Sequence, residues 1–422
     1  MNISNIKEKI DIYVNNNLTN IEQRKKFGEV FTPELLINKM LDLVSSDIWS
    51  NPNVKIGDFS VGVGNFTVFI IERFMNGLKD YISNDVDRYN YIIENIIYVG
   101  DLQERNIAYY KHLFGRNGHI YHGDFLSTDF DTQLKMWNVE FDYIISNPPY
   151  NANTDINKTN GNVIWDEFVI KSLDISDNII MIHPSIWRKP FGKTSKIKNI
   201  LTEFKKYDLS YLKINSLSDG KKYFNAGTRF DYYLLQKNIK NRNKTLIIDE
   251  NDVPILIDIR DCNFIPNKNI KEVYEYLSKE NDNFKVIYNS MYHAVNKELI
   301  SDVKDDVHIY PVVHSTPKSG VIYKYSSYNN KGHYGIPKVI FGESGTYNAF
   351  VDMKGEYAMT QCAIGIIIDS EEMGNDIVDF LKSDNFKKFM EACSWSNFRI
   401  DANILKYLSY KNIKKKIRWR TT

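Results

Sequence analysis

The first 265 residues alternate short apolar runs with longer amphipathic stretches. Apolar runs that predict buried strands lie at residues 54–59, 95–101, 118–125, 141–146, 177–184, 211–215, 231–237 and 244–250, and amphipathic stretches that predict helices lie at 65–78, 104–114, 164–175 and 195–206. Strands that alternate with helices form a parallel sheet flanked by helices. We therefore expect an α/β fold with a mostly parallel sheet, in which the strand at 231–237 is antiparallel.

Two further helices are predicted before the first strand. Residues 1–26 form a polar amphipathic stretch, and residues 32–44 predict a second helix. Thr32 is its expected N-cap, Pro33 takes the first turn, where a missing amide hydrogen is no loss, and Glu34 favours the helix N-terminus. We include both helices, within residues 1–45, in the first domain.

The pattern changes near Pro266. Beyond it the sequence is irregular and rich in tyrosine until helical periodicity resumes at residues 370–383. A chain of 422 residues with 43% hydrophobic residues can bury two cores of ordinary size. We therefore predict two domains, residues 1–265 and residues 266–422, the second with a mixed α+β fold.

A glycine turn follows the first predicted strand. In DFSVGVGNF, Gly62 and Gly64 stand between Asp58 and the helix that opens at Asn65 and Phe66. Glycines let the backbone approach a ligand closely, and the helix N-terminus behind them favours negative charge. Such a turn is common between a strand and a helix, so by itself it is weak evidence for a binding site.

Acidic residues end three successive predicted strands. They are Asp58, Asp101 in YVGD and Asp124 in HGDF. Because the carboxyl ends of parallel strands meet at one edge of a sheet, the three acids indicate one cleft, and an acid after the second strand typically receives the ribose hydroxyls of an adenosine-containing cofactor. Any one of these acids, taken alone, is better explained as a helix N-cap.

The predicted strand at 141–146 ends abruptly in SNPPY, residues 146–150. Two consecutive prolines forbid both a helix and a continued strand ladder, and they hold neighbouring groups rigid. The Asn147 side-chain oxygen and the Pro148 carbonyl can accept both hydrogens of an adenine amino group, which is a poor nucleophile because its lone pair is delocalised. These acceptors favour a tetrahedral nitrogen, and Tyr150 can lie flat against a base swung out of a duplex.

Together these motifs resemble the S-adenosylmethionine-dependent adenine-N6 DNA methyltransferases with gamma-ordered motifs, as found among type II restriction-modification methylases. SNPPY is similar to their catalytic motif, and GEVFTP, residues 28–33, is similar to the cofactor motif that precedes the glycine loop. The resemblance covers most of the first 265 residues and implies a Rossmann-like methyltransferase sheet followed by a target-recognition domain. One departure is Phe59, where the family often has proline.

Carried over by position, the resemblance implies two groups of site residues. S-adenosylmethionine would be held by Phe31, Thr32, Pro33, Asp58, Gly62, Gly64, Asn65, Phe66, Asp101, Asp124 and Phe125. The target base would be handled by Asn147, Pro148, Pro149 and Tyr150. His183 lies in a later motif but is expected to be structural, and the polar residues 151–162 are expected to form a loop that orders over DNA.

The net charge of +1 says nothing about nucleic acid, but the distribution of charge does. Residues 307–342 contain no acid, and their lysines are interleaved with tyrosines, which predicts a DNA-facing surface. The candidate contacts are Lys318, Lys324, Lys331 and Lys338, with Arg399 further along the chain. Residues 405–422 also carry only basic charges, and a solvated tail explains them equally well.

Other features exclude several classes of protein. No apolar run approaches the roughly 20 residues that span a bilayer, and the first residues lack the order of a signal peptide, so we expect a cytoplasmic protein without a membrane partner. Cys262, Cys362 and Cys393 show no CxxC spacing, which is typical of reduced thiols and predicts no metal site.

The sequence therefore predicts a site-specific adenine-N6 DNA methyltransferase that acts on double-stranded DNA and flips its target base. A restriction-modification role, with a companion restriction endonuclease, stays open. Two other enzymes stay open as alternatives, an RNA adenine-N6 methyltransferase and a protein-glutamine methyltransferase, since the amino group that each methylates also carries two hydrogens.

Overall fold

The chain forms two compact units, Met1–Trp187 with Ser195–Cys262, and Arg188–Thr194 with Asn263–Thr422. The computed structural model describes residues 3–18, 31–151, 163–190, 199–237, 244–280, 282–288, 292, 299–395 and 400–418. Residues 28–30 of the GEVFTP motif, residues 152–162 of the predicted DNA loop, and Arg399 lie outside this part.

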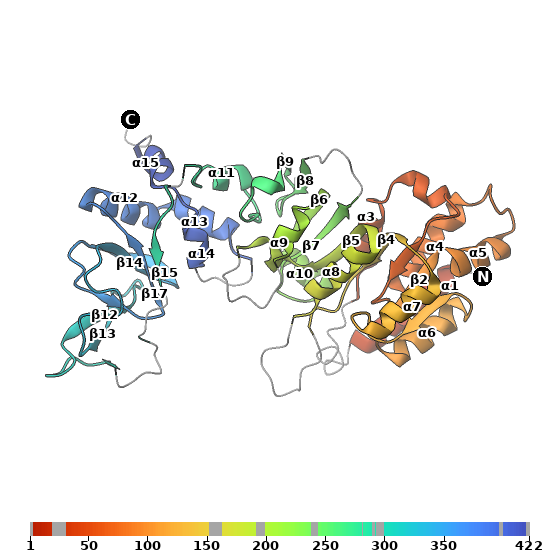
Figure 1. Ribbon diagram of the computed structural model, residues 1–422, viewed down its shortest axis with the longest axis horizontal. Helices are drawn as coiled ribbons and strands as arrows, with labels where there is room; N and C mark the ends of the chain where they lie inside the picture. Colours follow the sequence, from red (N-terminus) through yellow and green to blue (C-terminus); the bar gives the residue numbers. More distant parts are fainter. Residues whose placement is uncertain are drawn as a thin grey trace. The chain divides into compact units, whose positions relative to one another are not determined.

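A nine-stranded sheet organises the first unit (Figure 1). Its strands are β1 (Ile56–Asp58), β2 (Ile97–Asp101), β3 (His119–His122), β4 (Phe141–Ser146), β5 (Ser176–Pro184), β6 (Asp208–Asn215), β7 (Phe230–Gln236), β8 (Thr245–Ile248) and β9 (Pro254–Ile257). They lie in the order β3-β2-β1-β4-β5-β7-β6-β8-β9. The first five strands in this order are parallel, and β7 is antiparallel to both β5 and β6.

Helices cover the faces of this sheet, and strands such as β1 and β2 are buried along their length as a result. Every residue of β1 and β2 is buried, as expected for parallel strands with helices on both faces. The helical elements of the unit are α1 (Ile3–Leu18), α3 (Glu34–Leu41), η1 (Ser46–Ser50), α4 (Asn65–Gly77), α5 (Asp85–Asn95), α6 (Glu104–Phe114), α7 (Thr128–Trp137), α8 (Trp165–Ile175), α9 (Ile200–Phe204), α10 (Leu217–Phe224) and η3 (Ile259–Asp261). The short helix η2 (Ser185–Arg188) spans the point at which the chain first leaves the unit.

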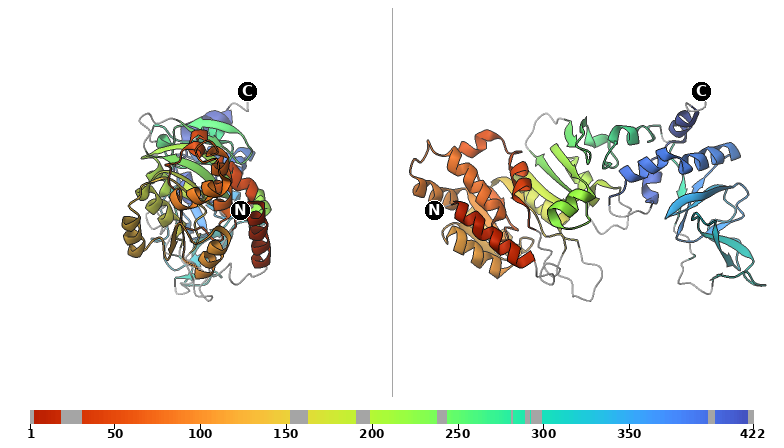
Figure 2. Two further views of the ribbon diagram at one scale, coloured as in Figure 1. Left: turned by 90° about the vertical axis from the view of Figure 1, so that its right-hand side faces the viewer. Right: turned by 180° about the vertical axis from the view of Figure 1, so that it is seen from behind.

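The N-terminal helix α1 belongs to the same core as the sheet. Ile6 and Ile10 are buried in that core, and the Lys7 ammonium pairs with Glu72 of α4 at 2.8 Å. In Figure 2 this helix is drawn in red against the orange helices of the unit.

The predicted α/β fold is confirmed, including the antiparallel strand at 231–237. The predicted N-cap of α3 is wrong by one residue: Pro33, with φ −65° and ψ 149°, is the N-cap, and it offers no side-chain hydrogen bond. Four elements were not predicted, α5, α7, α10 and the antiparallel strand β9. The three helices are rich in polar residues, and β9 is an apolar run of only four residues, too short to be told from a loop.

The second unit has two four-stranded sheets and a group of helices (Figure 1). The sheets have the orders β10-β17-β14-β15 and β11-β13-β12-β16. The strands are β10 (Val286–Ile287), β11 (Ile300–Ser301), β12 (Tyr310–Ser315), β13 (Ile322–Ser326), β14 (Lys338–Gly342), β15 (Gly345–Asp352), β16 (Ala358–Met359) and β17 (Ala363–Ile367), and the helices are α11 (Ile270–Tyr274), α12 (Glu371–Lys382), α13 (Asp384–Ala392), α14 (Ala402–Leu405) and α15 (Tyr410–Arg418). This is the predicted mixed α+β architecture.

Candidate active site

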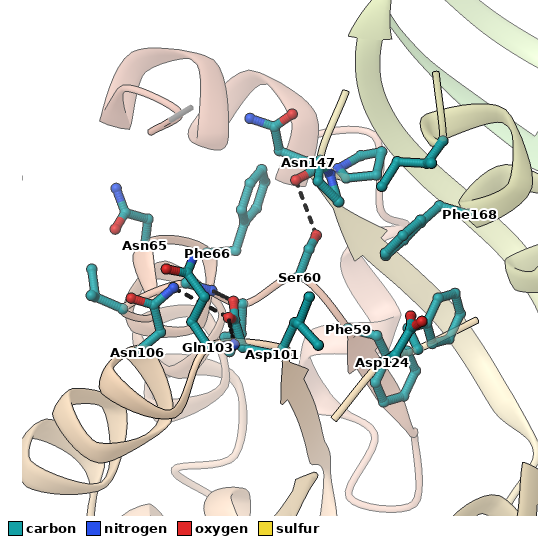
Figure 3. Close-up of a pocket in the computed structure, with 18 of the residues that line it drawn as sticks. Phe59, Ser60, Asn65, Phe66, Asp101, Gln103, Asn106, Asp124, Asn147 and Phe168 are labelled. Atoms are coloured by element: carbon teal, nitrogen blue, oxygen red, sulfur yellow. Dashed lines mark hydrogen bonds between the residues drawn. The ribbon is translucent and has the colours of Figure 1, made fainter. Parts of the chain in front are cut away.

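A cavity of about 360 Å³ opens in the first unit at the carboxyl edge of β1, β2 and β4 (Figure 3). The loops that follow these strands line it, together with the first residues of α4 and with Phe168 of α8. In an open α/β sheet this edge is where ligands bind.

The structure gathers most of the predicted site residues around this cavity. Those that line it are Phe31, Thr32, Gly62, Asn65, Phe66, Asp101, Asp124, Phe125, Asn147, Pro148 and Pro149. Pro33, Asp58, Gly64 and Tyr150 are not among the lining residues. The residues expected to hold a cofactor and those expected to act on a base therefore share one cavity.

The two glycines of the loop between β1 and α4 are required for different reasons. Both have positive φ, 56° at Gly62 and 95° at Gly64. A Cβ at Gly64 would lie 2.3 Å from the ring of Phe114, whereas a Cβ at Gly62 would meet no atom within 4 Å. Gly64 allows α4 to pack closely on α6, and Gly62 allows the turn that faces the cavity.

Asp101 joins the glycine loop to the loop after β2. One carboxylate oxygen accepts the Gly62 amide hydrogen at 2.9 Å, and the other accepts the Gln103 amide at 2.8 Å and the Asn106 side chain at 3.2 Å. Asp101 is 8% exposed and lines the cavity. Its oxygens are thus held at the edge where ribose hydroxyls are expected.

Asp58 turns away from the cavity. It is 3% exposed, and its Oδ1 lies 2.7 Å from the hydroxyl of Ser146 and accepts the Ser60 amide at 3.2 Å. The Ser146 hydroxyl lies 2.6 Å from that of Ser60, which donates to the Asn147 carbonyl oxygen at 3.0 Å. Burial raises the pKa of Asp58 to about 7.

Thr32 contacts the SNPPY motif directly. Its hydroxyl oxygen accepts a hydrogen bond from the Asn147 side-chain nitrogen at 3.1 Å, across 115 residues of sequence. Thr32 is 3% exposed, so this bond is shielded from water. The hydroxyl that would cap α3 in the sequence-based prediction instead holds the amide of Asn147.

The polar groups of two other motif residues, Tyr150 and His183, are buried. The hydroxyl of Tyr150 is buried without a hydrogen-bond partner among the described residues, and burial raises its pKa. His183 is fully buried, stacks on Trp165 with ring centroids 4.2 Å apart, and has its pKa lowered to about 3 by burial. His183 is therefore neutral and packed in the interior, which fits the structural role expected for it.

Several cavity residues were not predicted from the sequence. Among them are Phe59, Ser60, Leu102, Asn106, Ile164 and Phe168. Leu102 follows Asp101 directly, and Asn106 lies on the first turn of α6, so their closeness to a strand-end acid was an available signal. Phe168 had no such signal, since only the packing of α8 brings it to the cavity.

Phe59, the departure from the family pattern, packs one wall. Its ring stacks on Phe125 with centroids 5.0 Å apart and an interplanar angle of 8°, and it meets Phe130 edge-on at 4.7 Å. Stacked and edge-on pairs of this kind each contribute about 0.5–1.5 kcal/mol beyond the area they bury. The aromatic residue thus fixes the position of Phe125.

The predicted DNA-contact lysines of the second unit have different environments. Lys318 is exposed over the ring of Tyr347 at 5.1 Å, and Lys331 lies 4.4 Å over that of Tyr328. Lys324 forms an ion pair with Asp302. The prediction for Lys338 is wrong, because this lysine is fully buried, at 0% exposure, with its ammonium 2.7 Å from the Asp352 carboxylate.

The basic residues near the C-terminus are part of a packed helix. Ile413 of α15 is fully buried, and Lys411, Lys414 and Lys416 form ion pairs with Glu280, Glu372 and Glu275. A solvated tail therefore does not describe residues 410–416.

Two other expectations concern groups outside the cavity. Within the described ranges, no cluster of His, Cys, Asp or Glu has the arrangement of a metal site, and no helix is long and apolar enough to cross a membrane. Cys262, Cys362 and Cys393 are free thiols.

The two loop glycines give a matched stability test. Gly64→Ala should lower the free energy of unfolding by about 2–5 kcal/mol, because a left-handed φ and a clash with Phe114 add together. Gly62→Ala keeps only the first of these costs, about 1–2 kcal/mol. Thermal unfolding of both variants measures the difference, and equal losses would contradict the close contact at Gly64.

Comparison with known proteins found a match to one protein family. Residues 11–203 match the family model for N-6 DNA methylases. No curated protein matches the sequence.

Three solved structures show the range of structural similarity. The Type IIL restriction-modification enzyme MmeI, in complex with DNA, matches with a TM-score of 0.52 and 11% identity over 92% of this chain and 69% of that chain. A nuclease-deletion mutant of the Type ISP enzyme LlaGI, with a DNA substrate mimic, matches with a TM-score of 0.52 and 12% identity over 96% and 48%. The Type I EcoKI M protein matches with a TM-score of 0.39 and 16% identity over 51% and 47%.

The chain thus spans about half the length of the EcoKI M protein and of the LlaGI mutant. At these identities, the likeness to MmeI and LlaGI supports the methyltransferase-like fold. The family match covers residues 11–203, less than half of the chain, and the cavity that the predicted motifs share is lined by residues from this same part.

Proposed function

We propose that this protein transfers a methyl group from S-adenosylmethionine to the N6 amino group of adenine at a specific sequence in DNA. One observation carries the proposal: Asn147 and Pro148 of SNPPY line the same cavity as Asp101 and the glycine loop. A methyl donor and a target amine must meet within bonding reach, and a shared cavity provides that meeting place.

The lining residues fit the cofactor. Bound S-adenosylmethionine supplies a methyl group on a positively charged sulfur. Asp101 would accept the ribose hydroxyls, and Leu102, Phe125 and Phe168 offer apolar walls for the adenine ring. The buried side-chain oxygen of Asn65 has no hydrogen-bond partner in the described part of the chain, so it can accept from the methionine ammonium group.

The chain's contribution to the chemistry is the placement of hydrogen-bond acceptors. The Asn147 side-chain oxygen and the Pro148 carbonyl would accept the two amine hydrogens and favour a tetrahedral nitrogen with its lone pair free. Thr32 holds the Asn147 side chain and Ser60 holds its carbonyl. Two anchors and two prolines thus fix the acceptors before the base arrives, and fixed acceptors lose little energy to reorganisation.

Double-stranded DNA is the substrate that the second unit favours. The structural matches to MmeI and LlaGI extend over 92% and 96% of this chain, and both proteins were solved with DNA or a DNA mimic. Lys318 and Lys331, beside tyrosine rings, offer cations for phosphates and flat faces for bases. We assign sequence recognition to this unit and base extrusion to the cavity of the first unit.

A transfer assay with labelled S-adenosylmethionine tests the proposal against its alternatives. Duplex DNA, total RNA and a protein lysate are offered separately to the purified chain, and label should enter the adenine N6 position of DNA. Label in RNA adenine or in protein glutamine would replace the proposed substrate. Single-molecule sequencing of methylated bases then gives the recognition sequence.

Replacement of Asp101 tests the cofactor site. Asp101→Ala should weaken cofactor binding about tenfold or more, since charge-assisted hydrogen bonds contribute about 1.5–3 kcal/mol and the Gly62 amide also loses its acceptor. Titration calorimetry measures the affinity. Glu104→Ala is the control, because Glu104 is an exposed acid on α6 that does not line the cavity, and equal affinities for both variants would remove Asp101 from the site.

Replacement of Asn147 tests the acceptor chemistry. Asn147→Ala should lower kcat about a hundredfold or more with little change in cofactor affinity, because its oxygen contributes most when the nitrogen becomes tetrahedral. Steady-state kinetics on duplex DNA and cofactor titration separate the two effects. Asn90→Ala, at an exposed position on α5, is the control. If Asn147→Ala turns over at the wild-type rate, Asn147 takes no part in the chemistry, and the double proline of SNPPY serves only to end the strand.

The salt dependence of DNA binding tests the lysine surface. Lys318→Ala with Lys331→Ala should reduce the slope of log K against log salt by about one unit for each lysine–phosphate interaction that the substitutions remove. Lys411→Ala with Lys414→Ala removes the same charge from lysines that pair with Glu280 and Glu372, and should change the slope less. Identical slopes for the Lys318 and Lys331 variant and the wild type would place the DNA on another surface.

A further inference from the structure

We propose that Asp58 works as a neutral acid, a hydrogen-bond donor that positions Asn147 through Ser146 and Ser60, and not as a carboxylate that binds the cofactor. The inference rests on the proposed function for its readout, and it follows from the number of hydrogens available along one chain of contacts.

The chain of contacts has three links and ends on an atom that can only accept. The Ser60 hydroxyl donates to the Asn147 carbonyl oxygen at 3.0 Å, since a carbonyl has no hydrogen to give. Its single hydrogen is then used. The 2.6 Å contact between the Ser60 and Ser146 hydroxyls therefore takes its hydrogen from Ser146.

The last link then requires a hydrogen on Asp58. Ser146 has also used its only hydrogen, yet its oxygen lies 2.7 Å from Asp58 Oδ1, a hydrogen-bond distance. An ionised carboxylate has no hydrogen, and two oxygens with lone pairs facing each other at this distance repel. A protonated Asp58 donates to Ser146 and completes three bonds that all point toward Asn147.

The surroundings of Asp58 favour the neutral form. The residue is 3% exposed, and burial, the largest effect, raises its pKa to about 7 although the Ser60 amide hydrogen bond acts to lower it. Two titratable groups face it among the described residues: Asp101, whose charge further disfavours ionisation, and Tyr110 of α6, whose own pKa is raised by burial. We find no cation among the groups that act on Asp58 in the described structure.

The chain of hydrogen bonds ends at the main chain of Asn147, next to the two expected acceptors. Asn147 and Pro148 must hold two acceptors at fixed positions, and their shared peptide group is held by the bond from Ser60. Asp58 touches neither the cavity nor the expected reactants, so it is a positioning residue. Loss of the chain frees the peptide group that lies between the two acceptors, and turnover depends on their placement.

A pair of substitutions separates a neutral donor from a charged ligand. Asp58→Asn keeps a donor facing Ser146 and loses the longer bond from the Ser60 amide, so its kcat at pH 6 should stay within about threefold of the wild type. Asp58→Ala breaks the chain and should lower kcat about tenfold with cofactor affinity little changed. If Asp58→Asn is as impaired as Asp58→Ala, or if cofactor affinity falls equally in both, the carboxylate charge is required and the inference is wrong.

The pH profile gives a second readout. In the wild type the donor is present below pH 7 and is lost as Asp58 ionises above it, whereas Asp58→Asn keeps its donor throughout. Because loss of the donor costs about tenfold in kcat, the ratio of kcat for Asp58→Asn to that of the wild type should rise about fivefold between pH 6 and pH 8. A flat ratio would show that Asp58 does not change its protonation in this range.

A further variant and a spectroscopic measurement guard against misfolding and a wrong substrate. Ser146→Ala breaks the same chain of hydrogen bonds, so its kcat should match that of Asp58→Ala. The double variant Asp58→Ala with Ser146→Ala should show no further loss of kcat.

Infrared absorption of a protonated carboxyl group should be present in the wild type at pH 6, absent in Asp58→Asn, and lost from the wild type by pH 9, whatever the substrate is. Absence of this band at pH 6 would overturn the inference even if the chain methylates DNA. Conversely, its presence in a protein inactive on DNA would overturn the proposed function alone.

Discussion

Parallel strands that end at one edge of a sheet are the constraint on which the rest of this structure depends. β1 lies between β2 and β4, with Asp58 opposite Val99 and Gly57 opposite Ile144. This register brings the hydroxyls of Ser60 and Ser146, 86 residues apart, to 2.6 Å. Every motif of the site stands at the end of a strand or the start of a helix, so the sheet edge decides which motifs meet.

Much of this edge could be predicted from the sequence because it depends on local patterns. Apolar runs locate the strands, and a glycine turn or a double proline marks where a strand must stop. What local patterns do not contain is the direction in which a side chain turns. The hydroxyl of Thr32 can cap a helix or hold the Asn147 amide, and only the tertiary position of that amide decides between them.

The same reason explains the lysines of the second unit. A window of sequence without acids, such as residues 307–342, shows charges but hides partners that come from elsewhere in the chain. Lys324 pairs with Asp302, which lies just before that window, and Lys338 pairs with Asp352, which lies just after it. Burial distinguishes the two pairs. A surface pair such as that of Lys324 contributes about 0–1 kcal/mol to stability. The Lys338 ammonium is at 0% exposure, so removing its carboxylate partner would leave a buried, unpaired charge and strongly destabilise the fold.

Three acids that look equivalent in the sequence have three environments at this edge. Asp124 is exposed, Asp101 is partly open to the cavity, and Asp58 is enclosed behind the glycine loop. Two ionised carboxylates on neighbouring strands repel each other, and the charge of Asp101 contributes to the raised pKa of Asp58. A neutral Asp58 removes this repulsion while keeping its hydrogen bonds, so the edge can hold one charged acid that faces a ligand and one uncharged acid that fixes the backbone behind it.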